Sequence, residues 1–170
     1  EEAFEIESNY PFKGNIDLQK LEKTLQKSSK EKIPFVLLTI TCNSAGGQPV
    51  SIENMRAIRG LCDKYQVGFF IDGARFAENA YFIKTREKEF VKHSIKQIVK
   101  EIFSLADGMT MSAKKDGIVN MGGFIALNDS ELYKSCSTFA IMYEGFVTYG
   151  GMSGRDMAVS YTHLRAHETC

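Results

Sequence analysis

The stretch Phe35-Val-Leu-Leu-Thr-Ile-Thr41 decides the fold class of this 170-residue chain. It is a continuous apolar run that follows Pro34, and such a run is typical of a strand buried on both faces of a parallel sheet. The turn-forming residues Asn43-Ser-Ala-Gly-Gly-Gln-Pro49 end the run. The sequence therefore predicts a strand over 35–41 with a loop directly after it.

Helix and strand signals alternate on either side of this run. Upstream, Asp17 can cap a helix that ends near Gln26. Downstream, Ser51 can cap a helix that runs to Tyr65, because apolar residues recur there at helical spacing. A second apolar strand, residues 67–71, follows this helix, so the first half of the chain predicts a strand–helix–strand unit.

The same alternation continues in the second half of the chain. Ser94 and Gln97 form a capping-box pattern at the start of another helix, whereas residues 74–85 carry no clear signal. The remaining predicted elements are strands over 108–111 and 122–127 and a helix from Asp129 to about Ser137. Strands that alternate with helices predict one α/β domain, with a mostly parallel sheet and flanking helices.

Composition excludes several classes of protein. The chain is 44% hydrophobic and 25% charged, and its 21 basic and 21 acidic residues give a net charge of zero. A nucleic-acid partner is not expected without a basic excess, and a membrane span is not expected without about 20 consecutive apolar residues. The first residues, EEAFEIESNYPF, have no basic flank, apolar core or small-residue cleavage site, so we do not expect them to be a secretory signal. Four widely spaced cysteines predict reduced, mostly buried thiols in a cytoplasmic protein rather than a zinc site.

Polar side chains follow three successive strands of the predicted sheet. In open α/β sheets, ligands bind outside the carboxyl ends of the strands. The residues at these ends are Asn43 after the first strand, Asp72 and Arg75 after the second, and Ser112, Lys114 and Lys115 after the third. Their joint occurrence predicts a site at one edge of the sheet.

A lysine near an aspartate and an arginine suits a pyridoxal phosphate enzyme. The lysine amine can form a Schiff base with the cofactor aldehyde, and the carboxylate can keep the pyridine nitrogen protonated. Arginine and asparagine donors can hold the phenolate oxygen of the ring, while a serine hydroxyl and a second lysine can bind the phosphate.

Each of these residues also has a purely structural interpretation. Asp72 can cap the turn that follows it, and Arg75 can pair with Glu78 on the surface. The pair Lys114-Lys115 can be solvated, and Asn43 with the glycines after it can form a plain turn.

Four segments of the sequence resemble the β-eliminating lyases, the family that contains tryptophanase and tyrosine phenol-lyase. They are Thr41-Cys-Asn-Ser-Ala-Gly-Gly-Gln-Pro-Val-Ser51, Asp72-Gly-Ala-Arg-Phe-Ala-Glu-Asn-Ala-Tyr-Phe-Ile-Lys84, Met111-Ser-Ala-Lys-Lys-Asp116 and Tyr149-Gly-Gly151. The resemblance covers residues 10–159, in order and with matching spacing. It implies a fold type I pyridoxal phosphate enzyme, of which residues 1–159 are an internal part of the large cofactor-binding domain.

The resemblance also implies roles for catalytic residues. Lys115 resembles the lysine that forms the Schiff base and then takes the α-proton of the substrate. Asp72 resembles the partner of the pyridine nitrogen, and Tyr149 falls where an aromatic residue lines the site.

Other residues resemble the cofactor and metal ligands of the family. Asn43 and Arg75 resemble the donors to the phenolate oxygen, and Ser112 and Lys114 resemble residues near the phosphate. Asn120 falls where the family lends a backbone carbonyl to a potassium ion near a subunit interface. The resemblance thus implies pyridoxal 5'-phosphate and potassium as cofactors and a homotetramer as the assembly.

The implied reaction is β-elimination of an aromatic amino acid. Residues 74–84 and the Asn-Ser-Ala before the glycines are nearer to tryptophanase, so we expect L-tryptophan to yield indole, pyruvate and ammonium. Tyrosine phenol-lyase activity is the near alternative.

The last residues and the length of the chain lead to separate expectations. Residues 160–170 neither resemble the family nor show a helical apolar period, so we interpret them as a cloning or assembly artefact. Family enzymes are much longer, so we expect these 170 residues alone to be inactive and to bind the cofactor weakly. A non-catalytic chain is the alternative of a different class. A nucleotide-binding domain is more distant, because Ala45-Gly-Gly47 is too short a glycine motif.

Overall fold

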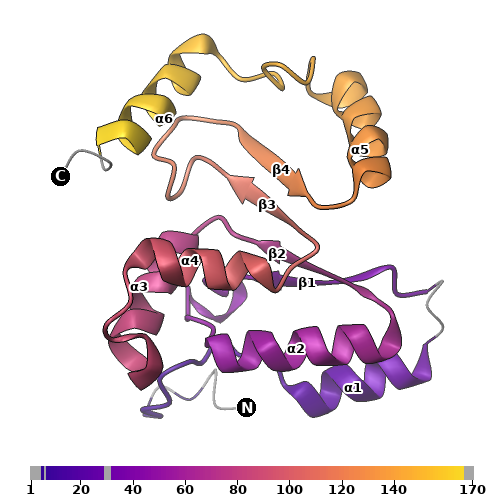
Figure 1. Ribbon diagram of the computed structural model, residues 1–170, viewed down its shortest axis with the longest axis vertical. Coiled ribbons are helices and arrows are strands. Elements are labelled where there is room, and N and C mark those ends of the chain that lie inside the picture. Colours follow the sequence, from indigo (N-terminus) through magenta and orange to yellow (C-terminus); the bar gives the residue numbers. More distant parts are fainter. Residues whose placement is uncertain (1–4, 6, 29–31, 167–170) are drawn as a thin grey trace.

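The computed structural model describes residues 5, 7–28 and 32–166, and its centre is a four-stranded sheet in the order β1-β2-β3-β4 (Figure 1). The strands are β1 (Phe35–Thr39), β2 (Gly68–Asp72), β3 (Gly108–Ser112) and β4 (Gly123–Leu127). β1, β2 and β3 run parallel, whereas β4 runs antiparallel to β3. The loop between β3 and β4 contains no helix and is too short for a crossover, so the chain returns antiparallel. The predicted α/β fold is confirmed.

Helices connect the parallel strands and continue beyond the sheet. α2 joins β1 to β2, and α3, η3 and α4 together join β2 to β3. The helices are α1 (Leu18–Lys27), α2 (Ile52–Tyr65), α3 (Phe76–Arg86), α4 (Ile95–Ser104), α5 (Ser130–Tyr143) and α6 (Gly154–Ala166), with short 3-10 helices η2 (Asn43–Ala45) and η3 (Lys88–Phe90).

The predicted helix caps are confirmed. Asp17 accepts a hydrogen bond from the backbone N–H of Lys20 at the start of α1. Ser51 accepts one from the backbone N–H of Asn54 at the start of α2. Ser94 and Gln97 form the complete capping box of α4. Asp129 caps α5, which ends at Tyr143 rather than near Ser137.

The hydrophobic core lies on one face of the sheet. Val36 and Leu38 of β1 and Phe69 and Ile71 of β2 point into it, and buried residues of α1–α4 complete it. On the opposite face, Phe35 and Leu37 are each 48% exposed. The prediction that the strand over 35–41 is buried on both faces is therefore wrong for the described residues, because the helices of the core cover only one face.

The expectation for the cysteines needs correction, whereas the interpretation of residues 160–170 as an artefact stays a prediction. α6 continues to Ala166, so residues 160–166 are helical despite their lack of an apolar period, whereas residues 167–170 lie outside the described part of the chain. Of the cysteines, Cys62 is buried, but Cys42 and Cys136 are only partly buried; all three are free thiols, and Cys170 lies outside the described residues. No helix in the described ranges has both the length and the apolar character to cross a bilayer.

Candidate active site

The chain segments that follow β1, β2 and β3 are held together by backbone hydrogen bonds. Ile40 N–H donates to the carbonyl of Asp72 (2.9 Å), and Gly73 N–H donates to the carbonyl of Thr110 (2.8 Å). Arg75 N–H donates back to the carbonyl of Ile40 (3.2 Å). The carboxyl ends of the three parallel strands therefore meet at one edge of the sheet, as the sequence predicted.

Arg75 and Asn43 connect the ends of β1 and β2. The Arg75 Nη1 donates to Asn43 Oδ1 at 3.2 Å. Arg75 precedes the first turn of α3, and Asn43 is the first residue of η2. The Arg75 side chain thus bonds Asn43 rather than Glu78, the surface partner of the structural interpretation. Because Asn43 Oδ1 accepts from Arg75, its Nδ2 is the atom oriented to donate elsewhere.

Lys115 and Ser112 come from the end of β3. The Lys115 Nζ donates to Ser112 Oγ at 3.2 Å, and both side chains are partly buried. Lys114 is exposed to solvent. Of the two adjacent lysines, Lys115 is therefore the one that the structure directs to a hydroxyl at the sheet edge.

Asp72 is the last residue of β2. Its register places it between Thr39 of β1 and Thr110 of β3, and it is partly buried. Asp72 Oδ1 accepts from Ala74 N–H at 3.3 Å, which is the turn-capping contact of the structural interpretation. This one contact leaves the carboxylate with further acceptor capacity.

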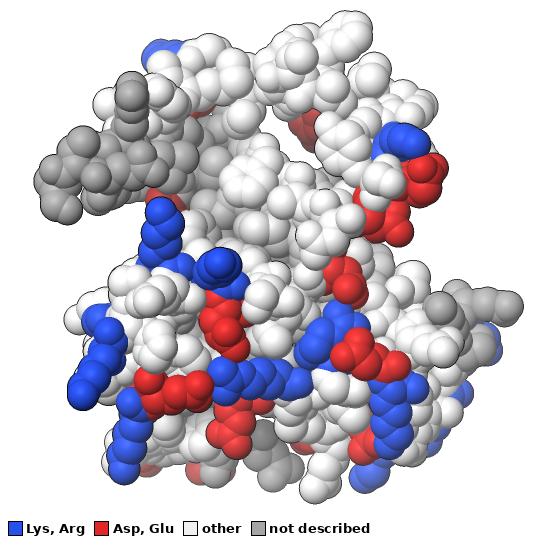
Figure 2. Space-filling model, in the orientation of Figure 1, with Lys and Arg blue, Asp and Glu red and all other residues white. Residues whose placement is uncertain are grey.

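A cavity of about 760 Å³ opens on the face of the sheet opposite the core. Asp72, Ser112 and Tyr149 all contribute to its lining, as do Tyr133 and Cys136 of α5. The volume falls within the roughly 300–1,000 Å³ of small-molecule sites. In the view of Figure 2, charged side chains gather over the α1–α4 part, while the surface of the α5–α6 part is mostly uncharged.

The structure does not bring every predicted residue to this cavity. Arg75 and Lys115 are partly buried, and Asn43, Lys114 and Asn120 are exposed. None of these five residues belongs to the lining of the cavity. Within the described ranges, no group of three or more His, Cys, Asp or Glu side chains lies close enough to hold a metal ion. A potassium site at the backbone carbonyl of Asn120 stays a prediction.

Sequence reasoning missed two residues that organise the site. Asn79 of α3 is fully buried and bonds both backbone groups of Val50, accepting from its N–H at 2.9 Å and donating to its carbonyl at 3.0 Å. Asp116 Oδ2 accepts from Ala77 N–H at 2.8 Å. In the sequence, Asn79 stands out only as a polar residue on the apolar side of the 76–83 segment. Asp116 stands out only by its place next to Lys115.

Comparison with known proteins identifies the family. The family model for the β-eliminating lyases matches residues 2–161. A Trichomonas vaginalis protein named "Probable beta-eliminating lyase" is 58% identical over 92% of this chain and 34% of its own length. Tyrosine phenol-lyase of Clostridium tetani is 53% identical over 92% of this chain and 34% of its own length. Tryptophanase of Salinibacter ruber is 52% identical over 89% of this chain and 32% of its own length.

A solved structure supports the fold. The crystal structure of a "putative L-allo-threonine aldolase" from Listeria monocytogenes superimposes with a TM-score of 0.56 at 21% identity, over 79% of this chain and 33% of that one. The expected fold type I architecture is confirmed. The chain spans about a third of the length of the curated relatives it matches, with 34% for two of them. By the match of its family model over residues 2–161, the chain belongs to the β-eliminating lyase family.

Proposed function

We propose that the protein carrying this chain catalyses pyridoxal-phosphate-dependent β-elimination of L-tryptophan to indole, pyruvate and ammonium. The observation that carries the proposal is the arrangement at the sheet edge. Lys115 Nζ donates to Ser112 Oγ, and Ser112 and Asp72 line one cavity. A hydroxyl and a carboxylate that line a cavity of small-molecule size, with a lysine amine bonded to that hydroxyl, suit this cofactor.

The residues present fit pyridoxal phosphate. Asp72 would hold the protonated ring nitrogen, Asn43 and Arg75 the phenolate oxygen, and Ser112 and Lys114 the phosphate. Lys115 would attach the cofactor covalently through Nζ. When bound, the cofactor supplies an electron sink for the electron pair left at the substrate α-carbon.

The chain's own residues orient the reaction and move protons. Lys115 Nζ, once it is free of the cofactor, is the base that takes the α-proton. The Asp72 carboxylate stabilises the positive charge on the ring nitrogen. Tyr149 supplies an aromatic wall of the cavity, which suits an indole or phenol leaving group.

Tyrosine phenol-lyase activity is the second candidate, because the Clostridium tetani relative of that name is 53% identical to this chain. The proposal further includes a potassium ion at Asn120, a homotetramer and a cytoplasmic location. By itself, the 170-residue chain is proposed to be inactive.

The test uses a protein of the relatives' full length that carries this sequence. We expect tryptophan to release indole at a higher kcat/KM than tyrosine releases phenol. Lys115→Ala abolishes turnover and the visible absorbance of the bound cofactor, whereas Lys92→Ala, at an exposed lysine outside the site, changes neither. Borohydride reduction followed by peptide mapping is expected to label Lys115.

Two results would contradict the proposal. Turnover that survives Lys115→Ala excludes the assigned lysine, and a higher kcat/KM for tyrosine assigns the second candidate. Turnover by the 170-residue chain alone would refute the expectation that it is inactive.

A further inference from the structure

Asp116, the residue directly after Lys115, contacts a helix that lies 39 residues earlier in the sequence. Its Oδ2 accepts from the backbone N–H of Ala77 at 2.8 Å and, at a longer 3.4 Å, from that of Glu78. Its own N–H donates to the carbonyl of Ala74 at 3.3 Å. Asp116 is therefore bonded to both sides of the point where α3 begins.

α3 depends on this remote carboxylate for its cap. The N-cap residue Arg75 makes no side-chain capping hydrogen bond, because a guanidinium has only donors; it donates to Asn43 instead. The first N–H groups of a helix need an acceptor, and a carboxylate at this end also interacts favourably with the helix dipole. Asp116, in the loop that follows β3, supplies both the acceptor and the negative charge.

The residues that precede α3 are those that face the cofactor in the proposed function. Asp72 ends β2, and Arg75 follows three residues later, so the segment capped by Asp116 carries both of them. The other backbone bonds of the Lys115 loop stay within residues 112–122, such as those from Lys115 N–H to the carbonyl of Ser112 and from Ile118 N–H to the carbonyl of Lys115. The bonds of Asp116 thus tie the loop of Lys115 to the segment of Asp72.

We propose that Asp116 is a positioning residue, which fixes Lys115 relative to Asp72 and Arg75 by capping α3. This inference rests on the proposed function of Lys115. It assigns to Asp116 no contact with substrate or cofactor. A small displacement of a reacting group costs rate far more than it costs stability, so the effect on catalysis exceeds that of losing a cap.

Asp17 offers a matched control. It caps α1 by the same chemistry, accepting from Lys20 N–H at 3.0 Å, but α1 contributes no residue to the lining of the cavity. Asp17→Ala therefore measures the loss of a helix cap without a change at the site.

The experiment compares Asp116→Ala, Asp116→Asn and Asp17→Ala in the full-length protein, well below the Tm of each variant. Stopped-flow absorbance follows the attachment of pyridoxal phosphate to the apoenzyme, and steady-state assays give kcat and KM. We expect Asp116→Ala to lower both the attachment rate and kcat by about 10²-fold with little change in KM. Asp116→Asn keeps an oxygen acceptor of the same size and is expected to recover part of both losses. Asp17→Ala is expected to lower only the Tm.

Equal behaviour of Asp116→Ala and Asp17→Ala, with a lowered Tm but unchanged attachment rate and kcat, would overturn the inference and leave the proposed function standing. A wild-type protein that forms no Lys115-dependent absorbance overturns the proposed function and the inference with it. If Asp116→Ala does not fold, the comparison of Asp116→Asn with wild type decides: an unchanged attachment rate counts against positioning, and a lowered one supports it.

Discussion

Asn79 shows how a single buried amide can hold a functional loop. Its side chain is fully buried in α3 and pairs with the N–H and the carbonyl of Val50, which closes the loop that begins at Asn43. Both bonds are removed from water, so no solvent replaces them if the amide is lost. The position of Asn43 next to Arg75 therefore depends on Asn79, whose own backbone N–H donates to the carbonyl of Arg75 at 3.0 Å.

We expect Asn79→Ala to lower the free energy of unfolding by about 2–5 kcal/mol, because it leaves two buried backbone groups of Val50 without partners. Urea unfolding of the full-length protein measures this. Asn128→Ala is the control: Asn128 is exposed and donates one hydrogen bond, to the carbonyl of Ala106, so a loss below about 1 kcal/mol is expected. Equal losses for the two variants would show that burial of the Asn79 bonds is not what stabilises the loop.

At the residue scale, the sequence predicted the place of the site better than its internal contacts. Strand order alone brought Asn43, Asp72 and Ser112 to one edge, because parallel strands end together. The bonds of Asn79 and Asp116 join residues 29 and 39 positions apart and follow from no local pattern.

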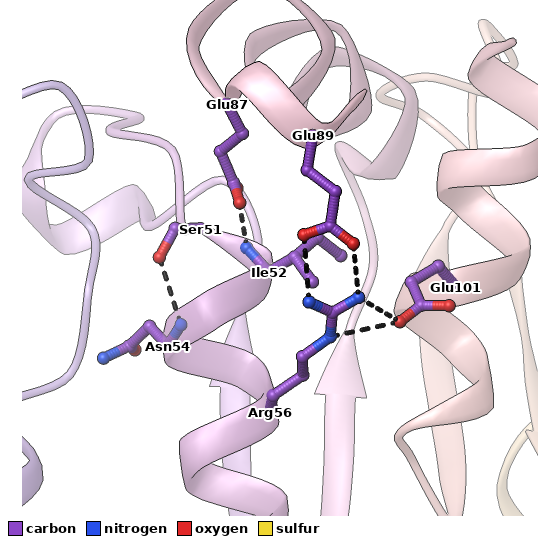
Figure 3. A network of polar contacts seen from close by, with 7 residues as sticks. All are labelled: Ser51, Ile52, Asn54, Arg56, Glu87, Glu89 and Glu101. Carbon is purple, nitrogen blue, oxygen red and sulfur yellow. Dashed lines mark hydrogen bonds and ion pairs between the residues drawn. The ribbon is translucent and has the colours of Figure 1, made fainter. Parts of the chain in front are cut away.

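The elements η3 and α4 are tied to α2 by charged side chains (Figure 3). Arg56 of α2 forms ion pairs with Glu89 of η3 at 3.1 Å and with Glu101 of α4 at 2.9 Å. Two residues before Glu89, Glu87 Oε1 accepts from the N–H of Ile52 at 2.8 Å and so helps to cap α2. Glu87 and Glu89 thus both bond to α2, but Glu87 is partly buried and Glu89 is exposed.

These surroundings move the pKa values of the two carboxyls in opposite directions. Burial raises the pKa of Glu87, and the nearby charges of Glu89 and Glu53 add to this, while the Ile52 N–H and Arg56 oppose it. Hydrogen bonds from the Arg56 guanidinium lower the pKa of Glu89. By linkage, the Glu87 contribution to stability is present at low pH and is lost as pH rises through its folded pKa. The Glu89 contribution is present at neutral pH and is lost as pH falls through its folded pKa.

We expect Glu87→Gln and Glu89→Gln to change the pH dependence of unfolding with opposite signs. At neutral pH, Glu87→Gln raises the free energy of unfolding, since glutamine can still accept from Ile52 without a buried charge, and Glu89→Gln lowers it slightly. The Glu87→Gln difference shrinks as pH falls through the raised pKa of Glu87, whereas the Glu89→Gln difference persists until pH falls through the lowered pKa of Glu89. Urea unfolding from neutral to acid pH checks this, and a loss of stability for Glu87→Gln at neutral pH would contradict it.

α1, α2, α4 and α5 were predicted correctly, whereas α3 and α6 were not predicted, although Ser153 accepts from the N–H of Asp156 at the start of α6. α1, α2, α4 and α5 begin at side chains that cap their own first turn, so sequence alone located their starts. α3 begins at Arg75, which makes no such bond, and its acceptor lies on Asp116. This is why residues 74–85 gave no clear signal.

On the scale of the whole molecule, one face of the sheet has a core and the other does not. The apolar run 35–41 suits a strand covered on both sides, but helices α1–α4 cover one side. α5 has no buried residue among its 14, although it carries several large apolar side chains. The sequence pattern indicates which residues favour burial. Whether a face of the sheet is buried depends on the helices that pack against it.

Leu37 and Leu38 provide a test of this asymmetry, because they are neighbours on β1 that face opposite sides. Leu37 is 48% exposed and Leu38 is 3% exposed. An uncovered apolar face of this kind favours self-association, so we expect the 170-residue chain to bind an apolar dye and to form oligomers in light scattering. Replacing both exposed residues, Phe35→Lys with Leu37→Lys, is expected to reduce dye binding and oligomer size while the far-UV circular dichroism is retained. Leu38→Lys places a charge in the core and is expected to unfold the chain. Tolerance of Leu38→Lys, or unfolding by the Phe35–Leu37 double variant, would mean that the core lies on the other side of the sheet.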